Sequence, residues 1–511
     1  MSSNLSFQNI PRDIFKYISV YLKINDVVSL GLSSKKQSKI IKTSIHKYIS
    51  EKKWYYESLI KLPVKLYKHV TLFQGRYEVN AKAGLINLKR LFLHDNSVIT
   101  TLMFQPTLTH LTIGVIKVVP RRPRPIGPVL PTIRFNLPIE PGVLPTSLTH
   151  LTLGGDFNQP IGIGVLPPNL TRLALVGNFN QPIDIGVLPP NLTDLGLGGD
   201  FNQPIGVGVL PPNLTRLALV GNFNQPIDIG VLPPNLIHLT LGSNYKKQIK
   251  NDALPTSITS LLLCENFDEI FIYGLPTSIK SLAIDWTFLR PIKRGFFSKN
   301  ITQLTIFNER SRNFEYKISK EDFPQNLTHL TFFGDFNHPI GAGVLPQNLT
   351  HLTMHSDRFN HPIGVGVLPS SLTHLEFGNV FNQPIGVNVL PSSLTHLTFG
   401  WMFNQPIEVD VLPSSLTHLT FIRDFNQPIG VNVLPPNLTH LTFGYYFNQP
   451  IGVNVLPPNL IHLILNEGFN HQIGVGVLPQ SLKNLEFGRN INPPISIDVL
   501  PVNLKHLNFK K

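Results

Sequence analysis

The stretch FNQPIGVGVLPPNLTRL, residues 201–217, recurs almost letter for letter along the chain and decides the fold. Its opening phrase F-N-Q-P-I returns every 22 residues, at Phe157, Phe179, Phe201 and Phe223. The register continues in variants or further copies of the phrase at Phe135, Phe336, Phe359, Phe381, Phe403, Phe425 and Phe447. A fixed period between about 20 and 50 residues is the signature of a solenoid, in which each repeat is one structural unit stacked on its neighbours.

One repeat, residues 166–187, predicts how a coil is built. Leu170, Leu173 and Leu175 form the pattern L-x-x-L-x-L. Its last three residues alternate as in a short strand, with the leucines pointing inward and Arg172 pointing outward. Because the pattern recurs in every coil, we expect the strands of successive coils to form one sheet.

The other half of the same coil carries Ile183, Ile185 and Val187 at alternate positions. Its glycine and proline content disfavours a helix. We therefore expect a second strand or extended segment there, with prolines fixing the corners because proline presets the backbone and removes a hydrogen-bond donor.

The first two letters of the phrase predict two structural rows. The phenylalanines are expected to stack inside the solenoid as a hydrophobic spine. The asparagine that follows each of them, as at Asn158, Asn180 and Asn202, is expected to form an amide ladder that satisfies backbone groups of the turn from coil to coil.

Composition excludes several classes of protein. The chain has 511 residues, of which 42% are hydrophobic, so it can bury a continuous core and is not disordered in composition. No apolar run reaches the roughly 18 residues of a membrane span, and the N-terminus lacks the pattern of a secretory signal. Cys264 is the only cysteine, which excludes an internal disulfide and favours an intracellular location.

The net charge of +13 is unevenly distributed. Residues 1–100 hold 17 Lys and Arg against 6 Asp and Glu, a net charge of +11, which leaves +2 for residues 101–511. The repeat array is therefore nearly neutral, and any attraction to nucleic acid or to an acidic protein surface is expected from the N-terminal part.

The phrase FNxPI within a 22-residue leucine-rich coil resembles the FNIP repeat family, a relative of leucine-rich repeats known chiefly from social amoebae and giant viruses. The resemblance covers about residues 125–511 and implies a protein-interaction solenoid. We expect the solenoid proper at residues 148–511, with an irregular part at 244–325. Residues 85–147 are expected to be degenerate coils that carry an insert rich in proline and arginine.

The first residues read differently, as a small all-α head over residues 5–54, followed by a linker at residues 55–84. Pro11 suits the first turn of a helix, and Ile14, Ile18 and Leu22 then fall on one helical face. A second and a third short helix are expected before residue 54.

The order of these residues resembles the F-box. That resemblance implies docking on a Skp-type adaptor, which joins a cullin scaffold in a ubiquitin ligase. The positions it assigns to adaptor contacts are Ile10, Pro11, Ile14, Ile18, Leu22, Val27, Leu30 and Leu32. The alternative is that these side chains only pack the core of the head.

The outward position before the second leucine is histidine in seven consecutive coils, among them His374, His396 and His418. A metal site is disfavoured, because zinc normally takes a closed set of three or four ligands and no cysteine or carboxylate accompanies this row. The row is either a set of solvent-facing residues copied by duplication or a target-binding surface. In the second case adjacent imidazolium groups would repel each other and titrate below the free pKa.

A specific ligand requires residues that differ between coils, so departures from the repeat indicate the contact patch. Arg172, Asp194 and Arg216 replace histidine on neighbouring coils and are the first candidates for target binding. No P-loop, nucleophile elbow or zinc-protease motif occurs, so we expect neither an enzyme nor a cofactor.

These features favour a mainly β, leucine-rich-repeat-like solenoid of 22-residue coils with a helical F-box head. The preferred function is a receptor that docks a ubiquitin ligase and holds a target protein. The alternatives are an interaction scaffold or decoy that recruits no ligase, and nucleic-acid binding through the basic first hundred residues. The last is disfavoured because the lysines there are not interleaved with aromatic residues on a strand.

Overall fold

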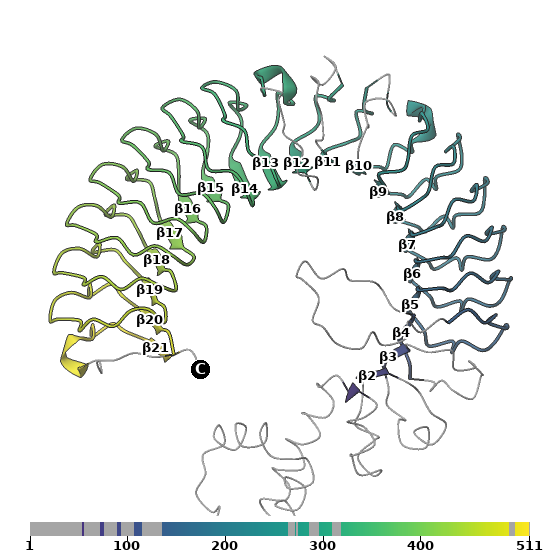
Figure 1. Ribbon diagram of the computed structural model, residues 1–511, viewed down its shortest axis with the longest axis horizontal. Coiled ribbons are helices and arrows are strands. Elements are labelled where there is room, and N and C mark those ends of the chain that lie inside the picture. Colours follow the sequence, from purple (N-terminus) through teal and green to yellow (C-terminus); the bar gives the residue numbers. More distant parts are fainter. Residues whose placement is uncertain are drawn as a thin grey trace, which may run out of the picture. The chain divides into compact units, whose positions relative to one another are not determined.

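The computed structural model describes residues 54–55, 72–75, 89–93, 107–114, 135–263, 271, 274–285, 296–308, 318–489 and 496–509. The chain divides into two compact units, Met1–Leu236 and Ile237–Lys511. Within each unit successive coils stack side by side, with a short strand along one side of every coil and turns along the other (Figure 1). Apart from Trp54, the head expected at residues 5–54 lies outside the described residues.

The strands of the first unit are β1 (Trp54–Tyr55), β2 (Leu72–Gly75), β3 (Arg90–Leu93), β4 (His110–Ile113), β5 (His150–Leu153), β6 (Arg172–Leu175), β7 (Asp194–Leu197) and β8 (Arg216–Leu219). Each strand pairs in parallel with the next. The sheet includes β1 and β2, which the sequence places at the end of the head and in the linker.

The strands of the second unit are β9 (His238–Leu241), β10 (Ser260–Leu263), β11 (Ser281–Asp285), β12 (Gln303–Asn308), β13 (His329–Gly334), β14 (His351–Ser356), β15 (His374–Phe377), β16 (His396–Phe399), β17 (His418–Phe421), β18 (His440–Phe443), β19 (His462–Leu465), β20 (Asn484–Phe487) and β21 (His506–Phe509). They too pair in parallel, each with the next. Short 3₁₀ turns occur at η4 (Asn251–Ala253), η5 (Lys320–Asp322) and η6 (Ile497–Val499).

The leucine pattern forms the core, as the sequence predicts. Leu170, Leu173 and Leu175 are buried, whereas Arg172 between them is exposed. Strand pairing sets Leu173 opposite its counterpart Leu195 in the next coil, so the inward rows are continuous. The prediction of a mainly β, leucine-rich-repeat-like solenoid of 22-residue coils is confirmed for the described residues.

The phenylalanine spine is also confirmed. Phe157, Phe179, Phe201 and Phe223 are buried, and the rings of Phe179 and Phe201 stack with centroids 6.0 Å apart and planes 6° from parallel. The next pair, Phe201 and Phe223, repeats the 6.0 Å spacing. Each ring therefore fills the space between its two neighbours.

The asparagine ladder has the geometry expected of it. The backbone N–H of Asn180 donates to Oδ1 of Asn158 at 2.8 Å, and that of Asn202 donates to Oδ1 of Asn180 at 2.9 Å. The Gln181 amide adds bonds to the carbonyl and to Oδ1 of Asn158, at 3.2 and 3.1 Å. Each of these coils thus satisfies corner groups of the next one.

Of the second strand or extended segment expected around Ile183, Ile185 and Val187, the strand does not form, because residues 185–187 form a turn. Gly186 has a φ of 85°, and the Val187 N–H donates to the Asp184 carbonyl at 3.2 Å. The left-handed residue reverses the backbone, so Ile183 and Val187 point into the core while Ile185 is 65% exposed.

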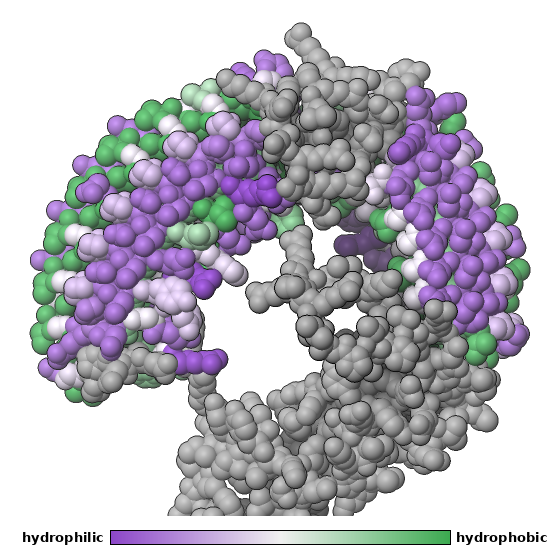
Figure 2. Space-filling view, in the orientation of Figure 1, coloured by the Kyte–Doolittle hydropathy of each residue, from purple (hydrophilic) through white to green (hydrophobic). Residues whose placement is uncertain are grey.

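The exposed residue of this turn recurs in both units. In the first unit the row consists of Ile163, Ile185, Val207 and Ile229, and in the second of Val365, Val387, Val409, Val431, Val453 and Val475. Figure 2 shows hydrophobic and hydrophilic residues as bands that repeat from coil to coil within each unit. Alternation alone did not reveal this outward row.

Candidate protein-interaction surface

The outward positions of the strands carry the candidate binding residues. In the second unit, parallel pairing sets the same position of successive coils opposite each other, so His374 faces His396 and His396 faces His418. We call the stacked set the His ladder; its members are His329, His351, His374, His396, His418 and His440. The ring centroids of His396 and His418 are 4.1 Å apart and their planes lie 12° from parallel.

A row of threonines fixes the tautomer of these rings. The Thr395 hydroxyl donates to the Thr373 carbonyl at 3.0 Å and also lies 2.9 Å from Nδ1 of His396. A hydroxyl has one hydrogen, and it is used on the carbonyl, so Nδ1–H of His396 must donate to Oγ1 of Thr395. The neutral ring then carries its lone pair on Nε2. The same pair of contacts occurs at Thr417 with His418, so the ladder is a row of acceptors.

The imidazoles of His374, His396 and His418 are mainly neutral at pH 7, because their pKa values lie below 6.5. Burial against neighbouring groups is the larger cause that lowers the pKa of His374, His396 and His418, and the charges of other ladder histidines lower it further. For His418 the pKa falls from 6.5 to about 4. The sequence analysis predicts the direction of this pKa shift, but it attributes the shift to repulsion between imidazolium groups, whereas burial is the larger cause.

We expect the imidazole of His418 to titrate with a midpoint near 4, as measured by NMR of ¹³C-labelled histidine. Between pH 6.5 and 4 the unfolded chain takes up a proton that the folded chain does not, so stability falls as the pH falls through this window. A His396→Asn variant, which places on β16 the residue found at Asn484 on β20, should raise the pKa of His418 toward its ordinary value. A midpoint near 6.5 in the unaltered protein would contradict the stacked arrangement.

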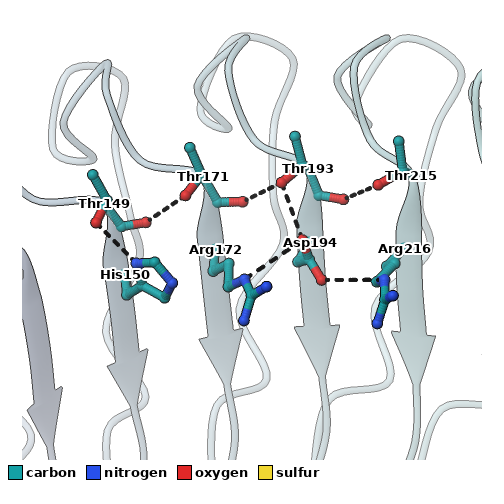
Figure 3. Close-up of polar contacts among 8 residues, drawn as sticks. All are labelled: Thr149, His150, Thr171, Arg172, Thr193, Asp194, Thr215 and Arg216. Carbon is teal, nitrogen blue, oxygen red and sulfur yellow. Dashed lines mark hydrogen bonds and ion pairs between the residues drawn. The ribbon is translucent and has the colours of Figure 1, made fainter.

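In the first unit the outward row carries charge instead. Asp194 on β7 lies between Arg172 on β6 and Arg216 on β8 (Figure 3). Nε of Arg172 is 3.7 Å from Oδ2 of Asp194, and Nε of Arg216 is 3.8 Å from Oδ1. The structure therefore brings these three candidates together, as their spacing predicts.

This Arg–Asp–Arg triad suits recognition better than stability. Exposed ion pairs contribute about 0–1 kcal/mol, and both arginine side chains of this triad are more than half exposed. A guanidinium offers five donors in a planar fork, and a single carboxylate between two of them leaves several of these donors available. The triad carries one net positive charge and can accept a carboxylate of a partner.

Metal sites, membrane-spanning helices and adaptor contacts can be assessed only for the described residues. Among them, no group of three or more His, Cys, Asp or Glu is arranged to hold a metal ion. Within the same part of the chain, no helix has the length and hydropathy needed to cross a membrane. The adaptor-contact positions proposed between Ile10 and Leu32 lie outside the described residues.

Comparisons with known proteins agree with the repeat. The family model described as FNIP Repeat matches residues 135–176, 179–220, 223–265, 314–357, 336–380, 359–400, 381–424, 425–468 and 469–511. The structure of CroV588, titled a novel circular LRR protein, is 38% identical, with a TM-score of 0.52 over 86% of this chain and 69% of that one.

More distant structures share less. YopM from Yersinia enterocolitica WA-314 is 20% identical with a TM-score of 0.36, over 85% of this chain and 96% of that one. A chain of the Drosophila Toll–Spatzle complex is 15% identical with a TM-score of 0.43, over 81% and 60%. No curated protein sequence matches. The family model alone covers more than half of the residues, and the chain belongs to the FNIP repeat family.

Proposed function

We propose that this chain is a protein-interaction receptor without catalytic activity, whose solenoid binds a target protein through the outward face of its strands. The observation that carries this proposal is the register of the parallel strands, which joins one position of successive coils into the His ladder. A continuous row of this kind supports recognition of an extended protein surface. Sites for drug-sized molecules are usually enclosed and mostly apolar, unlike this row of outward polar side chains.

The chemistry of the row defines the partner. Neutral imidazoles with the lone pair on Nε2 accept hydrogen bonds, so His374, His396 and His418 fit a surface that presents N–H or O–H donors. In the first unit, Arg172 and Arg216 fit a surface carboxylate beside Asp194. The His ladder is therefore expected to recognise donor groups of a protein surface, and the Arg–Asp–Arg triad is expected to recognise an acidic residue.

The second half of the proposal is ligase recruitment through the F-box-like head. Residues 5–54 would dock a Skp-type adaptor with the apolar positions named above, and the solenoid would hold the target near the ligase. Tethering of this kind raises the effective concentration to roughly the millimolar range without any chemistry of the receptor itself. This function requires an intracellular location.

Co-purification from cells, quantified by mass spectrometry, tests both halves with full-length variants. Substituting His374, His396 and His418 by alanine should reduce recovery of the target about tenfold or more while the adaptor is retained. Substituting Ile14 and Leu22 by aspartate should remove the adaptor and retain the target. Val431→Ala and Val453→Ala, at exposed positions outside the ladder, serve as the matched control.

The outcomes separate the candidate functions. If the unaltered protein recovers a target that depends on the His ladder but recovers no adaptor, the function is that of a scaffold or decoy and not of a ligase receptor. A target whose recovery is unchanged by the three histidine substitutions would refute the His ladder as the binding surface.

A further inference from the structure

Six consecutive coils of the second unit, from Phe359 to Phe469, depart from the repeat at the two residues before the phrase, and three of them carry large side chains there. These three coils hold Trp401 and Met402, Arg423 and Asp424, and Tyr445 and Tyr446. Four coils of the first unit hold glycine followed by Asp or Asn there, as at Gly199 and Asp200. Duplication of one coil does not produce this change, and it places large side chains on the surface, with Trp401 47% and Tyr446 48% exposed.

These side chains hold one another in a defined arrangement. The Arg423 guanidinium lies 5.5 Å from the ring centroid of Trp401 and 5.5 Å from that of Tyr446. Its Nη2 donates to the Tyr446 hydroxyl at 3.5 Å, and its Nε is 3.6 Å from Oδ1 of Asp424. Rings fixed in this way offer an aromatic surface at little cost in conformational entropy.

The same residues border an open pocket of about 690 Å³. Its wall also includes Asp357, Asn404 and Asn426. The asparagine ladder already occupies the Oδ1 atoms of both asparagines. Oδ1 of Asn404 accepts from the Asn426 N–H, and Oδ1 of Asn426 accepts from the Asn448 N–H. The Nδ2 groups of Asn404 and Asn426 thus remain as donors, while Asp357 and Asp424 supply acceptors.

The mixture of groups identifies the ligand class. A hydroxyl both donates and accepts, so an array that alternates amide, carboxylate and guanidinium groups matches a ligand with many neighbouring hydroxyls. The apolar C–H face of a pyranose ring packs against an aromatic ring, and two aromatic rings border this pocket. Phosphate or sulfate is disfavoured, because the pocket wall holds two carboxylates and one guanidinium, a net charge of −1.

We infer that this pocket, which we call the Trp401 pocket, binds a neutral saccharide. Aromatic packing on Trp401 and Tyr446 would hold the ring, and the Asp424 carboxylate with the Arg423 guanidinium would bind adjacent hydroxyls. This site uses none of the residues of the His ladder or of the Arg–Asp–Arg triad. The saccharide site can therefore be tested independently of target binding.

The test is binding of the full-length protein to a glycan array that includes neutral, sialylated and sulfated glycans, with affinities then measured by calorimetry. We expect neutral glycans to bind, and Trp401→Ala and Asp424→Ala each to weaken that binding about tenfold or more. Phe333→Ala is the matched control, because Phe333 is an exposed aromatic residue of β13 outside the pocket. It should leave the affinity unchanged.

Circular dichroism of each variant checks that the fold is retained, which the exposure of Trp401 supports. The inference is overturned if no neutral glycan binds, if only sulfated or sialylated glycans bind, or if Trp401→Ala binds as well as the unaltered protein. Preference of the same pocket for a proline-rich peptide or for single-stranded RNA over every neutral glycan would also overturn it.

Discussion

Replacing Phe201 by alanine is expected to lower the local free energy of unfolding by about 3–5 kcal/mol. The ring is fully buried and stacks between Phe179 and Phe223, with both centroid distances at 6.0 Å. Its removal leaves a cavity that the neighbouring coils cannot close, because their own rings are fixed by the next coils. Native-state hydrogen exchange of the β7 and β8 amides measures the effect, which a global melt would blur because long repeat arrays lose two-state behaviour.

The neighbouring coil supplies matched controls for the Phe201→Ala variant. Ile183→Ala removes a buried side chain and should cost about 2–4 kcal/mol, whereas Ile185→Ala removes an exposed one and should stay within about 0.5 kcal/mol. Equal protection in the Phe201→Ala and Ile185→Ala variants would show that the phenylalanine spine is not part of the core.

Replacing Gly199 by alanine is expected to cost more than about 3 kcal/mol and to separate two coils. Gly199 has a φ of 66°, and an added Cβ would overlap the carbonyl oxygen of Gly177 and lie 2.6 Å from its nitrogen. Backbone atoms of a stacked coil cannot move aside as a side chain can. A left-handed conformation alone costs an L-residue only about 1–2 kcal/mol, so the overlap accounts for the larger part.

Gly186→Ala isolates the conformational cost. Gly186 also has a positive φ, 85°, but an added Cβ would meet only the flexible end of Ile163 at 3.8 Å. Native-state hydrogen exchange of the β6 and β7 amides should therefore place Gly186→Ala about 1–2 kcal/mol below the unaltered protein and well above Gly199→Ala. Gly186→Asn should be milder still, because Asn388 occupies the equivalent place with a φ of 63°. Similar losses of stability in Gly186→Ala and Gly199→Ala would show that the contact with the Gly177 backbone does not add to the cost.

The inward rows were predictable because they depend on one-dimensional patterns. Leu173 and Leu175 alternate, Phe201 recurs at a fixed period, and both properties follow from stacking identical coils. The contact between Arg172 and Asp194 was predictable for the same reason, since parallel pairing in register makes residues one period apart neighbours.

The turn at Ile185 was not predicted, because an Ile-x-Ile-x-Val pattern has the same alternation in a strand as in this turn. The signal lies in other coils, where the residue after the exposed aliphatic one is Gly186, Asn388 or Asp410. Exchange among glycine, asparagine and aspartate at one position indicates a left-handed backbone. The Trp401 pocket was not predicted, because its large side chains lie in the turns just before the phrase and not at the outward positions of the strands.

The asparagine ladder also bears on how such a gene changes. The bond between Asn202 and Asn180 is the same as the bond between Asn224 and Asn202, because each backbone N–H donates to the Oδ1 atom one period earlier. Unequal crossing-over that inserts or deletes whole periods therefore yields a product with every internal corner bond restored. Copy number can drift between lineages at little energetic cost, whereas a shift of one codon inside the phrase breaks the bonds on both sides.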